Sequence, residues 1–305
     1  MRKEVAGMLF IGGTVFLWSM IEVITKLIHS SLPPLTIAYL RFVLGGLFLL
    51  PIAVAYGRRV NWKLVTARDW VKLFLLSFLG ISCAFSLFHI ALYWIDASST
   101  ATLIAMVPLI IAPLSMIFLK ERIGVIGVVG IVMGAASILL IYFSEERGLR
   151  SIYAIALIII AVFCFSVYAV FMKPLNRKMD PKVTTSLSLF LGGLMMVPIV
   201  IFDGSPLIRP MEPTSWMLLL FLSFITVGLA YLLYFMGLDR VRVSTGNSLM
   251  YLKPLIATIL AWLVLGEVPT LIRTVAILIA SISVFMVVRE KWMRYRLRGK
   301  RRKFD

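Results

Sequence analysis

Chemically reactive side chains are scarce in this chain of 305 residues. Its two cysteines, Cys83 and Cys164, lie far apart within apolar runs, which excludes a disulfide framework and metal-ligand spacing. Its two histidines, His29 and His89, are too few for a zinc-protease or histidine-rich redox site. A phosphate-binding glycine loop is missing, as are paired acids at the spacing that binds magnesium in lipid-modifying enzymes. The sequence therefore has no enzyme signature and predicts no cofactor and no metal.

Charge is also scarce, and no polar stretch is long enough to form a soluble domain. Only 15% of the residues are charged, whereas 61% are hydrophobic, and the mean hydropathy is +1.00. A soluble domain has about a quarter charged residues. Apolar runs of about 18 residues or more are typical of membrane-spanning helices. Such runs recur along the whole length of this chain.

Ten membrane spans are predicted, each near the roughly 20 residues that a helix needs to cross a bilayer. Lipid offers backbone groups no hydrogen-bond partners, so these runs must be helical. The first apolar run is too long for a signal peptide and lacks a small-residue cleavage site, so it is counted as a span. The predicted spans cover about 7–28, 34–56, 70–94, 97–119, 124–143, 151–172, 183–202, 215–237, 241–265 and 270–288.

The distribution of basic residues predicts the orientation. With the amino terminus in the cytoplasm, the loops on the opposite side contain few basic residues, namely Arg147, Arg150, Arg209 and Arg273. Cytoplasmic loops are richer in Lys and Arg, which predicts a multi-pass protein of the cell membrane with both termini cytoplasmic. The same bias accounts for the net charge of +17 without a nucleic-acid partner. The basic tail, 289–305, is expected to contact anionic lipid.

The chain contains one unit twice. Residues 88–141, shifted by 146 positions, align without a gap on residues 234–287. Pro108 then aligns with Pro254 and Glu121 with Glu267, and both residue types are rare inside apolar segments. A shift of 147 aligns Lys26 with Lys173, Gly45-Gly46 with Gly192-Gly193 and Pro51 with Pro198. We therefore predict repeats at 1–146 and 147–288, followed by the tail.

Each repeat has five spans, and an odd number places the two copies in opposite orientations in the bilayer. Inverted repeats are typical of secondary transporters, which bind their substrate near the midplane where the halves meet. The predicted fold class is all-α integral membrane, with ten transmembrane helices as two inverted five-helix repeats around a central cavity.

The sequence resembles the EamA-type family of the drug/metabolite transporter superfamily. The residues that carry the resemblance are Trp18-Ser19 and Lys26, Arg41-Phe42, and Ala97 to Thr100 leading to Pro108 and Leu119-Lys120-Glu121, with the copy of that last segment at Lys253-Pro254 and Leu265-Gly266-Glu267. The resemblance implies ten helices around a central cavity and transport of small metabolites, with amino acids or related compounds as the first expectation.

Charged residues inside spans are functional candidates, because a charge at the centre of a membrane helix costs about 2.5–3.5 kcal/mol on insertion scales. Glu22 and Lys26 are four residues apart and can pair on one helix face, which Trp18 continues. They either line a cavity or form a local ion pair, with Lys26 reaching the outer headgroups. Glu22 is also the candidate for proton coupling. Arg41 either binds a substrate carboxylate or, as the favoured interpretation, pairs with Glu22 and holds spans one and two together.

Lys253 is placed just before Pro254, near the middle of span nine, where proline interrupts a regular helix. Pro108 makes the same interruption in span four, with Val107 in place of the lysine. The asymmetry predicts a contact to an anionic substrate group, or else a partnership of Lys253 with Glu22 or a carbonyl. Further candidate substrate contacts are Asn247, Ser248, Tyr251, Tyr234, His89 and Thr102.

Other motifs are interpreted as structural. Glu121 and Glu267 end spans four and nine on opposite membrane faces, so they are expected to cap the following helix or to tie loops. Gly130-xxx-Gly134 and Ala276-xxx-Ala280 predict close helix contacts, within the subunit or in a homo-oligomer.

The predicted function is alternating-access transport of small organic metabolites that carry a carboxylate or phosphate. The predicted partners are this substrate and the lipid bilayer. The alternatives are a membrane-embedded lipid-modifying enzyme and a non-transporting receptor or scaffold.

Overall fold

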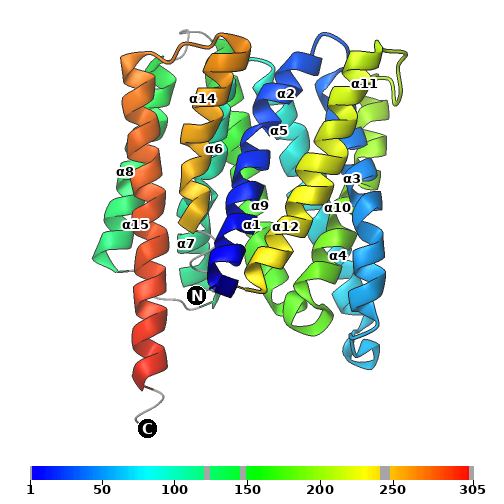
Figure 1. Ribbon diagram of the computed structural model, residues 1–305, viewed down its shortest axis with the longest axis vertical. Helices are drawn as coiled ribbons and strands as arrows, with labels where there is room; N and C mark the ends of the chain where they lie inside the picture. The colour runs from blue at the N-terminus through cyan, green and yellow to red at the C-terminus, as the bar shows by residue number, and fades with distance from the viewer. Residues whose placement is uncertain (1, 120–123, 145–148, 241–247, 302–305) are drawn as a thin grey trace.

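The structure is a computed structural model that describes residues 2–119, 124–144, 149–240 and 248–301. Helices make up most of the described part of the chain, and it contains no strands. In Figure 1 the long helices run side by side, and both termini lie toward its lower end. The helices are α1 (Arg2–Ser19), α2 (Ile21–Ile28), α3 (Pro34–Gly57), α4 (Ala67–Ser77), α5 (Ala84–Leu92), α6 (Ala97–Ala105), α7 (Val107–Leu119), α8 (Val125–Ser144), α9 (Leu149–Met179), α10 (Pro181–Phe202), α11 (Pro213–Leu220), α12 (Ala230–Leu238), α14 (Lys253–Leu265) and α15 (Leu271–Arg301).

Eight helical stretches in the described residues are long and apolar enough to cross a membrane, and two shorter apolar helices follow them. The shorter helices are Lys253–Leu265 and Leu271–Met286, which fall in the predicted ninth and tenth spans. Residues 241–247 of the predicted ninth span lie outside the described residues. The chain is thus a multi-pass membrane protein built from helices.

The last helix extends into the predicted basic tail. The tail is predicted to begin at residue 289, and α15 continues through that point without interruption to Arg301. Lys, Arg, Leu and Met are good helix formers, so the change from apolar to basic composition does not end the helix.

Several spans contain a local break in regular α-helix. The first is broken at Met20 between α1 and α2, and the fourth at Met106 between α6 and α7. Two spans contain π-helical segments, η2 (Phe78–Cys83) and η3 (Phe221–Leu229). When the sequence is shifted by 146 residues, η2 aligns with the second part of η3, and Phe78 aligns with Phe224. Insertions of this kind occur often at functional sites.

Glycines bring spans of the two predicted repeats into close contact in matching pairs. A Cβ on Gly45 would lie 2.6 Å from the Ser223 carbonyl oxygen, and one on Gly192 would lie 3.1 Å from the Ser77 carbonyl oxygen. Gly45 and Gly192 are equivalent in the repeat, as are Ser77 and Ser223. Contacts between α3 and η3 therefore reappear between α10 and η2.

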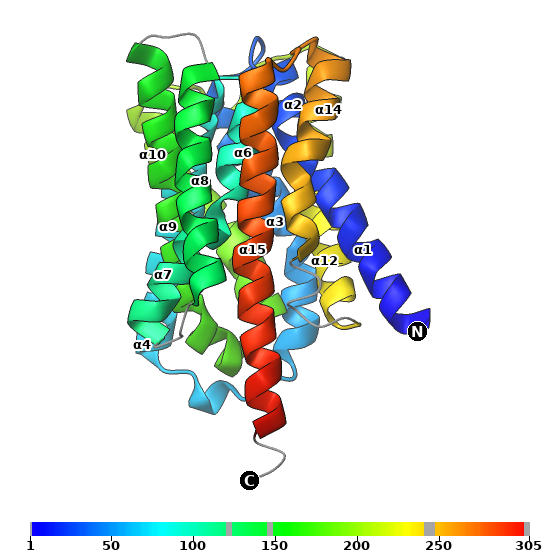
Figure 2. The ribbon, with the colours of Figure 1, turned by 90° about the vertical axis from the view of Figure 1, so that its left-hand side faces the viewer.

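The α3–α10 contact depends on a second glycine pair, Gly46 and Gly193. A Cβ on Gly46 would lie 2.6 Å from backbone atoms of Phe190, and one on Gly193 would lie 2.7 Å from the Val43 nitrogen. Helices α8 and α15 also pack together and stand side by side in Figure 2. A Cβ added to Gly134 in α8 would lie 3.2 Å from the hydroxyl of Ser283 in α15.

Gly46→Ala is expected to lower stability by about 1–3 kcal/mol, because backbone atoms of α10 cannot move away from the added methyl as a side chain can. Gly12→Ala is the matched control, since a Cβ there meets nothing within 4 Å. Thermal unfolding of the purified protein in detergent measures both. Equal midpoints for the two variants would contradict the close approach of α3 and α10.

Candidate functional site

A buried ion pair joins α2 and α14. Lys253 Nζ donates to Glu22 Oε1 at 2.6 Å. The Glu22 side chain is 0% exposed and that of Lys253 is 11% exposed. Glu22 Oε2 has no partner among the described residues. The sequence left Lys26, Arg41 and Lys253 as possible partners of Glu22. The structure pairs Glu22 with Lys253, from the second half of the chain, whereas Lys26 pairs with Glu267.

The pair lies where two spans leave regular α-helix. Glu22 follows the break at Met20, and Lys253 is the first residue of α14, directly after the 3₁₀ segment η4 (Ser248–Leu252). The Ser19 hydroxyl bonds to the Val15 carbonyl at 2.7 Å and approaches the Lys253 carbonyl at 3.3 Å. Two interrupted helices are thus joined by both a side-chain ion pair and a side-chain to backbone contact.

The serine-to-carbonyl contact recurs at the equivalent positions, without the charges and without a break in α9. Ser166, the equivalent of Ser19, bonds to the Val162 carbonyl at 2.6 Å and approaches the Val107 carbonyl at 3.5 Å. Val107 is the equivalent of Lys253, and Ala169 is the equivalent of Glu22. The chain therefore makes the serine contact twice and the ion pair once.

Aromatic side chains line the same region. The ring of Trp18 lies 5.1 Å from that of Tyr231 and 5.5 Å from that of Tyr234. The indole Nε1 of Trp18 donates to the Thr226 carbonyl, inside η3, at 3.1 Å. The Thr14 hydroxyl donates to the Ala230 carbonyl at 3.1 Å. These contacts tie α1 to the π-helical span and place Trp18 and Tyr234 close together, as residues of one site require.

Lys26 belongs to a separate network at the end of the bundle opposite the termini (Figure 1). Its Nζ lies 2.9 Å from Glu267 Oε1 and 3.8 Å from Asp96 Oδ1. The Glu267 carboxylate also accepts the Ala97 backbone N–H, at 3.0 Å to Oε2, so it satisfies the amino terminus of α6. Glu267 was expected to cap the helix that follows it or to tie loops. It does not cap α15 but, from the loop before it, binds the amino terminus of α6 in the other predicted repeat.

Two further features complete this network of α2, α6, α14 and α15, which we call the distal network (Lys26, Asp96, Ala97, Glu267 and Arg273). Arg273, at the start of α15, forms an ion pair with Asp96. Gly266 ends α14 with a positive φ of 71°, which turns the chain so that Glu267 reaches α6. Asp96 and Arg273 were missed as site residues from the sequence. The position of Asp96 directly before Ala97-Ser98-Ser99 was the available signal.

His29 lies directly after α2, three residues beyond Lys26 in the sequence. Burial, and secondarily the positive charge of Lys26, lower the pKa of His29 to about 4. Its ring is therefore neutral at physiological pH and adds no charge to the distal network.

Arg41 does not pair with Glu22, contrary to the favoured sequence interpretation. Its side chain is buried in α3, and its guanidinium carbon lies 5.0 Å from the centre of the Phe42 ring and 5.9 Å from that of Phe85. Nε and Nη1 have no hydrogen-bond partner among the described residues. A cation over an aromatic ring gains about 0.5–2 kcal/mol. This gain falls short of the several kcal/mol lost when a charge leaves water.

The other candidate residues from the sequence lie in different places, and some lie outside the described residues. The His89 Nδ1 bonds to the Phe85 carbonyl at 2.8 Å, and the Thr102 hydroxyl bonds to the Ser98 carbonyl at 2.7 Å, so both make contacts within their own helices. Pro108 and Pro254 each stand second in a helix that follows a break. Asn247 and Glu121 lie outside the described residues, and for Ser248 and Tyr251 only the backbone, in η4, is described.

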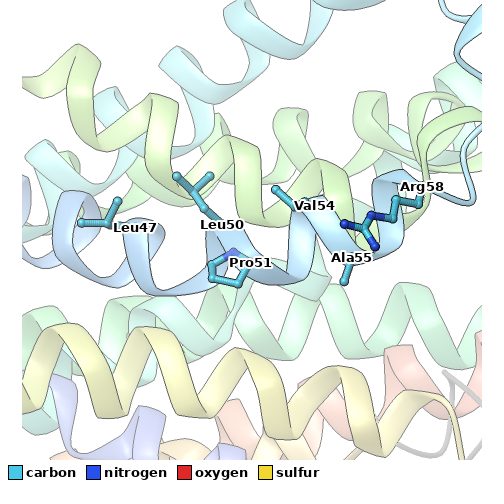
Figure 3. Close-up of a pocket in the computed structure, with 6 residues that line it drawn as sticks. All are labelled: Leu47, Leu50, Pro51, Val54, Ala55 and Arg58. Atoms are coloured by element: carbon cyan, nitrogen blue, oxygen red, sulfur yellow. The ribbon is translucent and has the colours of Figure 1, made fainter.

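Among the hollows on the described part of the surface are two that do not adjoin the buried pair. The first, of about 530 Å³, lies along α3 and is lined by Leu47, Leu50, Pro51, Val54, Ala55 and Arg58 (Figure 3). Most of these side chains are exposed and apolar, as expected for a surface that contacts lipid. The second, of about 310 Å³, lies between α4 and α9. The predicted central cavity therefore stays a prediction. Among the described residues, no group of His, Cys, Asp and Glu is arranged to hold a metal ion.

Comparison with known proteins decides the family. The model of the EamA-like transporter family matches residues 5–143 and again residues 152–289. The chain belongs to the EamA-like transporter family. This assignment confirms the resemblance found in the sequence and is consistent with the drug/metabolite transporter superfamily.

The relatives extend over nearly the whole chain. An uncharacterized transporter of Archaeoglobus fulgidus is 26% identical over 281 residues, covering 91% of this chain and 97% of the relative. An uncharacterized transporter of Clostridium kluyveri is 26% identical over 286 residues, covering 90% and 92%. A WAT1-related chloroplastic protein of Arabidopsis thaliana is 21% identical, covering 89% and 67%. The family and these names indicate a transporter rather than an enzyme.

A solved crystal structure has the same fold. It superposes with a TM-score of 0.67 at 18% identity and covers 93% of this chain and 97% of its own. At this identity the likeness concerns the fold alone.

Glu22→Gln and Lys253→Met are each expected to destabilise the protein by about 3–5 kcal/mol, because each leaves an unpaired buried charge. The double variant Glu22→Gln/Lys253→Met removes both charges and is expected to regain most of the lost stability. A double-mutant cycle, measured by thermal unfolding in detergent, gives the interaction free energy between the Glu22 and Lys253 side chains. Additive losses in the double variant would show that the two side chains do not interact.

Proposed function

We propose that this protein is a secondary transporter that moves small organic metabolites across the cell membrane by alternating access. The observation that carries the proposal is the buried Glu22–Lys253 pair at the point where two interrupted spans meet. Interrupted helices near the midplane form the substrate sites of many secondary transporters. The proposal extends the general transporter role indicated by the family to a site and a mechanism.

The architecture proposed for this mechanism is two inverted repeats, 1–146 and 147–288, with ten spans around a central site. Matching contacts support it: those of Gly45 and Gly192, and those of Ser19 and Ser166, recur after the repeat shift. Two copies in opposite orientations can exchange conformations, which provides two states of similar energy that open to opposite sides. The proposed location is the cell membrane, with both termini cytoplasmic and the basic tail on anionic lipid.

The distal network is the proposed closure on the side away from the termini. It joins α2 and α6 of the first repeat to Glu267 and Arg273 of the second. Access from that side requires Lys26 to separate from Glu267 and Asp96. The buried pair is shielded from solvent in this structure, as a closed state requires.

The proposed substrates are amino acids or related metabolites with an acidic group. Lys253, Lys26, Trp18 and Tyr234 are the proposed contacts or gating residues, with Asn247, Ser248 and Tyr251 on the interrupted ninth span. Helices α8 and α15, which carry the small-xxx-small motifs, pack against each other within the subunit. These motifs therefore do not call for a homo-oligomer, which is a separate proposal. The alternatives are a lipid-modifying enzyme and a receptor or scaffold, neither of which would move solute.

Purified protein in liposomes is expected to exchange labelled amino acids or organic acids across the membrane. The double variant Glu22→Gln/Lys253→Met separates folding from function, because it removes the charges without leaving one unpaired. We expect at least a tenfold loss of transport at near-normal stability, whereas Lys63→Ala, an exposed lysine, leaves transport unchanged. Normal transport by the double variant would disprove the role of the pair.

Glu22 is the proposed proton-coupling group, because its Oε2 is unpartnered in a buried site. Glu22→Gln is expected to flatten the dependence of transport on pH, measured in the same liposomes between about pH 5 and 8. Unchanged rate and unchanged pH dependence in this variant would remove Glu22 from the coupling mechanism.

A further inference from the structure

Arg41 presents a buried positive charge without a negative partner. The residue is 3% exposed, and its Nε and Nη1 donate to no group among the described residues. Buried ionised groups are normally paired or fully hydrogen-bonded, so each exception calls for an explanation. Phe42 and Phe85 contact the guanidinium through their rings, which leaves its N–H edge available.

Unpartnered polar atoms also occur on the neighbouring helices. Glu22 lies within electrostatic range of Arg41, yet its Oε1 is occupied by Lys253 and its Oε2 is unpartnered. Ser86 Oγ and His89 Nε2 on α5 are likewise buried without a partner in the described structure. Since Glu22 compensates Lys253, the positive charge of Arg41 remains uncompensated in this group.

Arg41 also lies where the two halves of the chain meet. Phe85, whose ring it faces, is equivalent in the repeat to Tyr231, and Tyr231 is within electrostatic range of the same guanidinium. Residues from corresponding places in both halves therefore surround Arg41. Its own counterpart is Ser188, so this charge, like that of Lys253, is present in one half only. Transporters with inverted repeats bind their substrate at such an interface.

The arrangement of donors indicates what kind of group Arg41 binds. A guanidinium edge offers parallel N–H groups that match the two oxygens of a carboxylate, whereas its face packs on aromatic rings. One carboxylate balances the single uncompensated charge, while a doubly charged phosphate would leave an excess negative charge in the same buried space. A ligand amine or hydroxyl is the matching partner for Glu22 Oε2.

We propose that Arg41 is the anchor for the carboxylate of a small monocarboxylic acid, and that Glu22 Oε2 accepts a hydrogen bond from an amine or hydroxyl of the same molecule. This site deepens the transport function proposed above and rests on it. The ion pair with Lys253 holds Glu22 in place, and the rings of Phe42 and Phe85 lie beside the guanidinium.

The test measures binding and transport with Arg41→Met and, as a matched control, Arg58→Met at the exposed end of the same helix. Probes are the common amino acids and α-hydroxy acids, each beside its carboxamide, which lacks the negative charge. Wild type and Arg58→Met are expected to bind at least one acid tenfold or more tightly than its amide, read by thermal shift and by exchange in liposomes. In Arg41→Met we expect this ratio to fall to about one.

Stability distinguishes the anchor from a structural cation. Arg41 forms no ion pair among the described residues, so Arg41→Met is expected to unfold at or above the wild-type midpoint in the absence of ligand. A lower midpoint together with an unchanged acid-to-amide ratio would overturn the proposal. Wild-type protein that shows no preference for any acid over its amide would overturn it as well. If the Arg41 proposal fails but the same liposomes exchange uncharged compounds, the proposed transport function still holds.

Discussion

The structure depends on one constraint: lipid supplies no partner for a charge or a hydrogen-bonding group, so a polar group in a span is costly unless it finds a partner inside the protein. Lys253 and Glu22 satisfy it by pairing with each other across the two halves of the chain at 2.6 Å. Lys26 satisfies it with Glu267, whose carboxylate also accepts the Ala97 N–H. The contacts that make the charges tolerable are the same ones that hold α2, α6 and α14 together.

Contacts that recur in both halves of the chain concern packing, whereas several charged residues differ between the halves. The glycine contacts between α3 and α10, the serine contacts to the carbonyls of Lys253 and Val107, and the overlapping π-helical segments occur in both halves. The charges of Glu22, Arg41 and Lys253 each have an uncharged equivalent in the other half, namely Ala169, Ser188 and Val107. Shared contacts let the two halves pack alike. The unmatched charges make the two halves differ, which suits the asymmetric substrate site proposed above.

The breaks in the helices connect this packing to conformational change. Met20, Met106 and η4 interrupt spans at or beside the serine contacts, and η2 and η3 lie against the glycine contacts. Helices kink where their regular hydrogen bonding is interrupted, and such positions can absorb changes in backbone angle. Lys26 lies in α2, after the break at Met20, and Glu267 follows the end of α14. In the proposed transport cycle, a change at the breaks would therefore reach the distal network.

Composition and repetition alone determined that this chain is a helical membrane protein, and the rare residues within its apolar runs indicated its family. The membrane allows only helices there, and glutamate, lysine and proline inside spans are too costly to occur without a reason. Which charges meet was decided by the tertiary structure. Glu22 and Lys26 share a helix face, yet each pairs with a residue more than 200 positions away, and Arg41 has no ionic partner among the described residues. Periodicity identifies neighbours on one helix, whereas the approach of α14 to α2 depends on packing between distant segments, which no local pattern encodes.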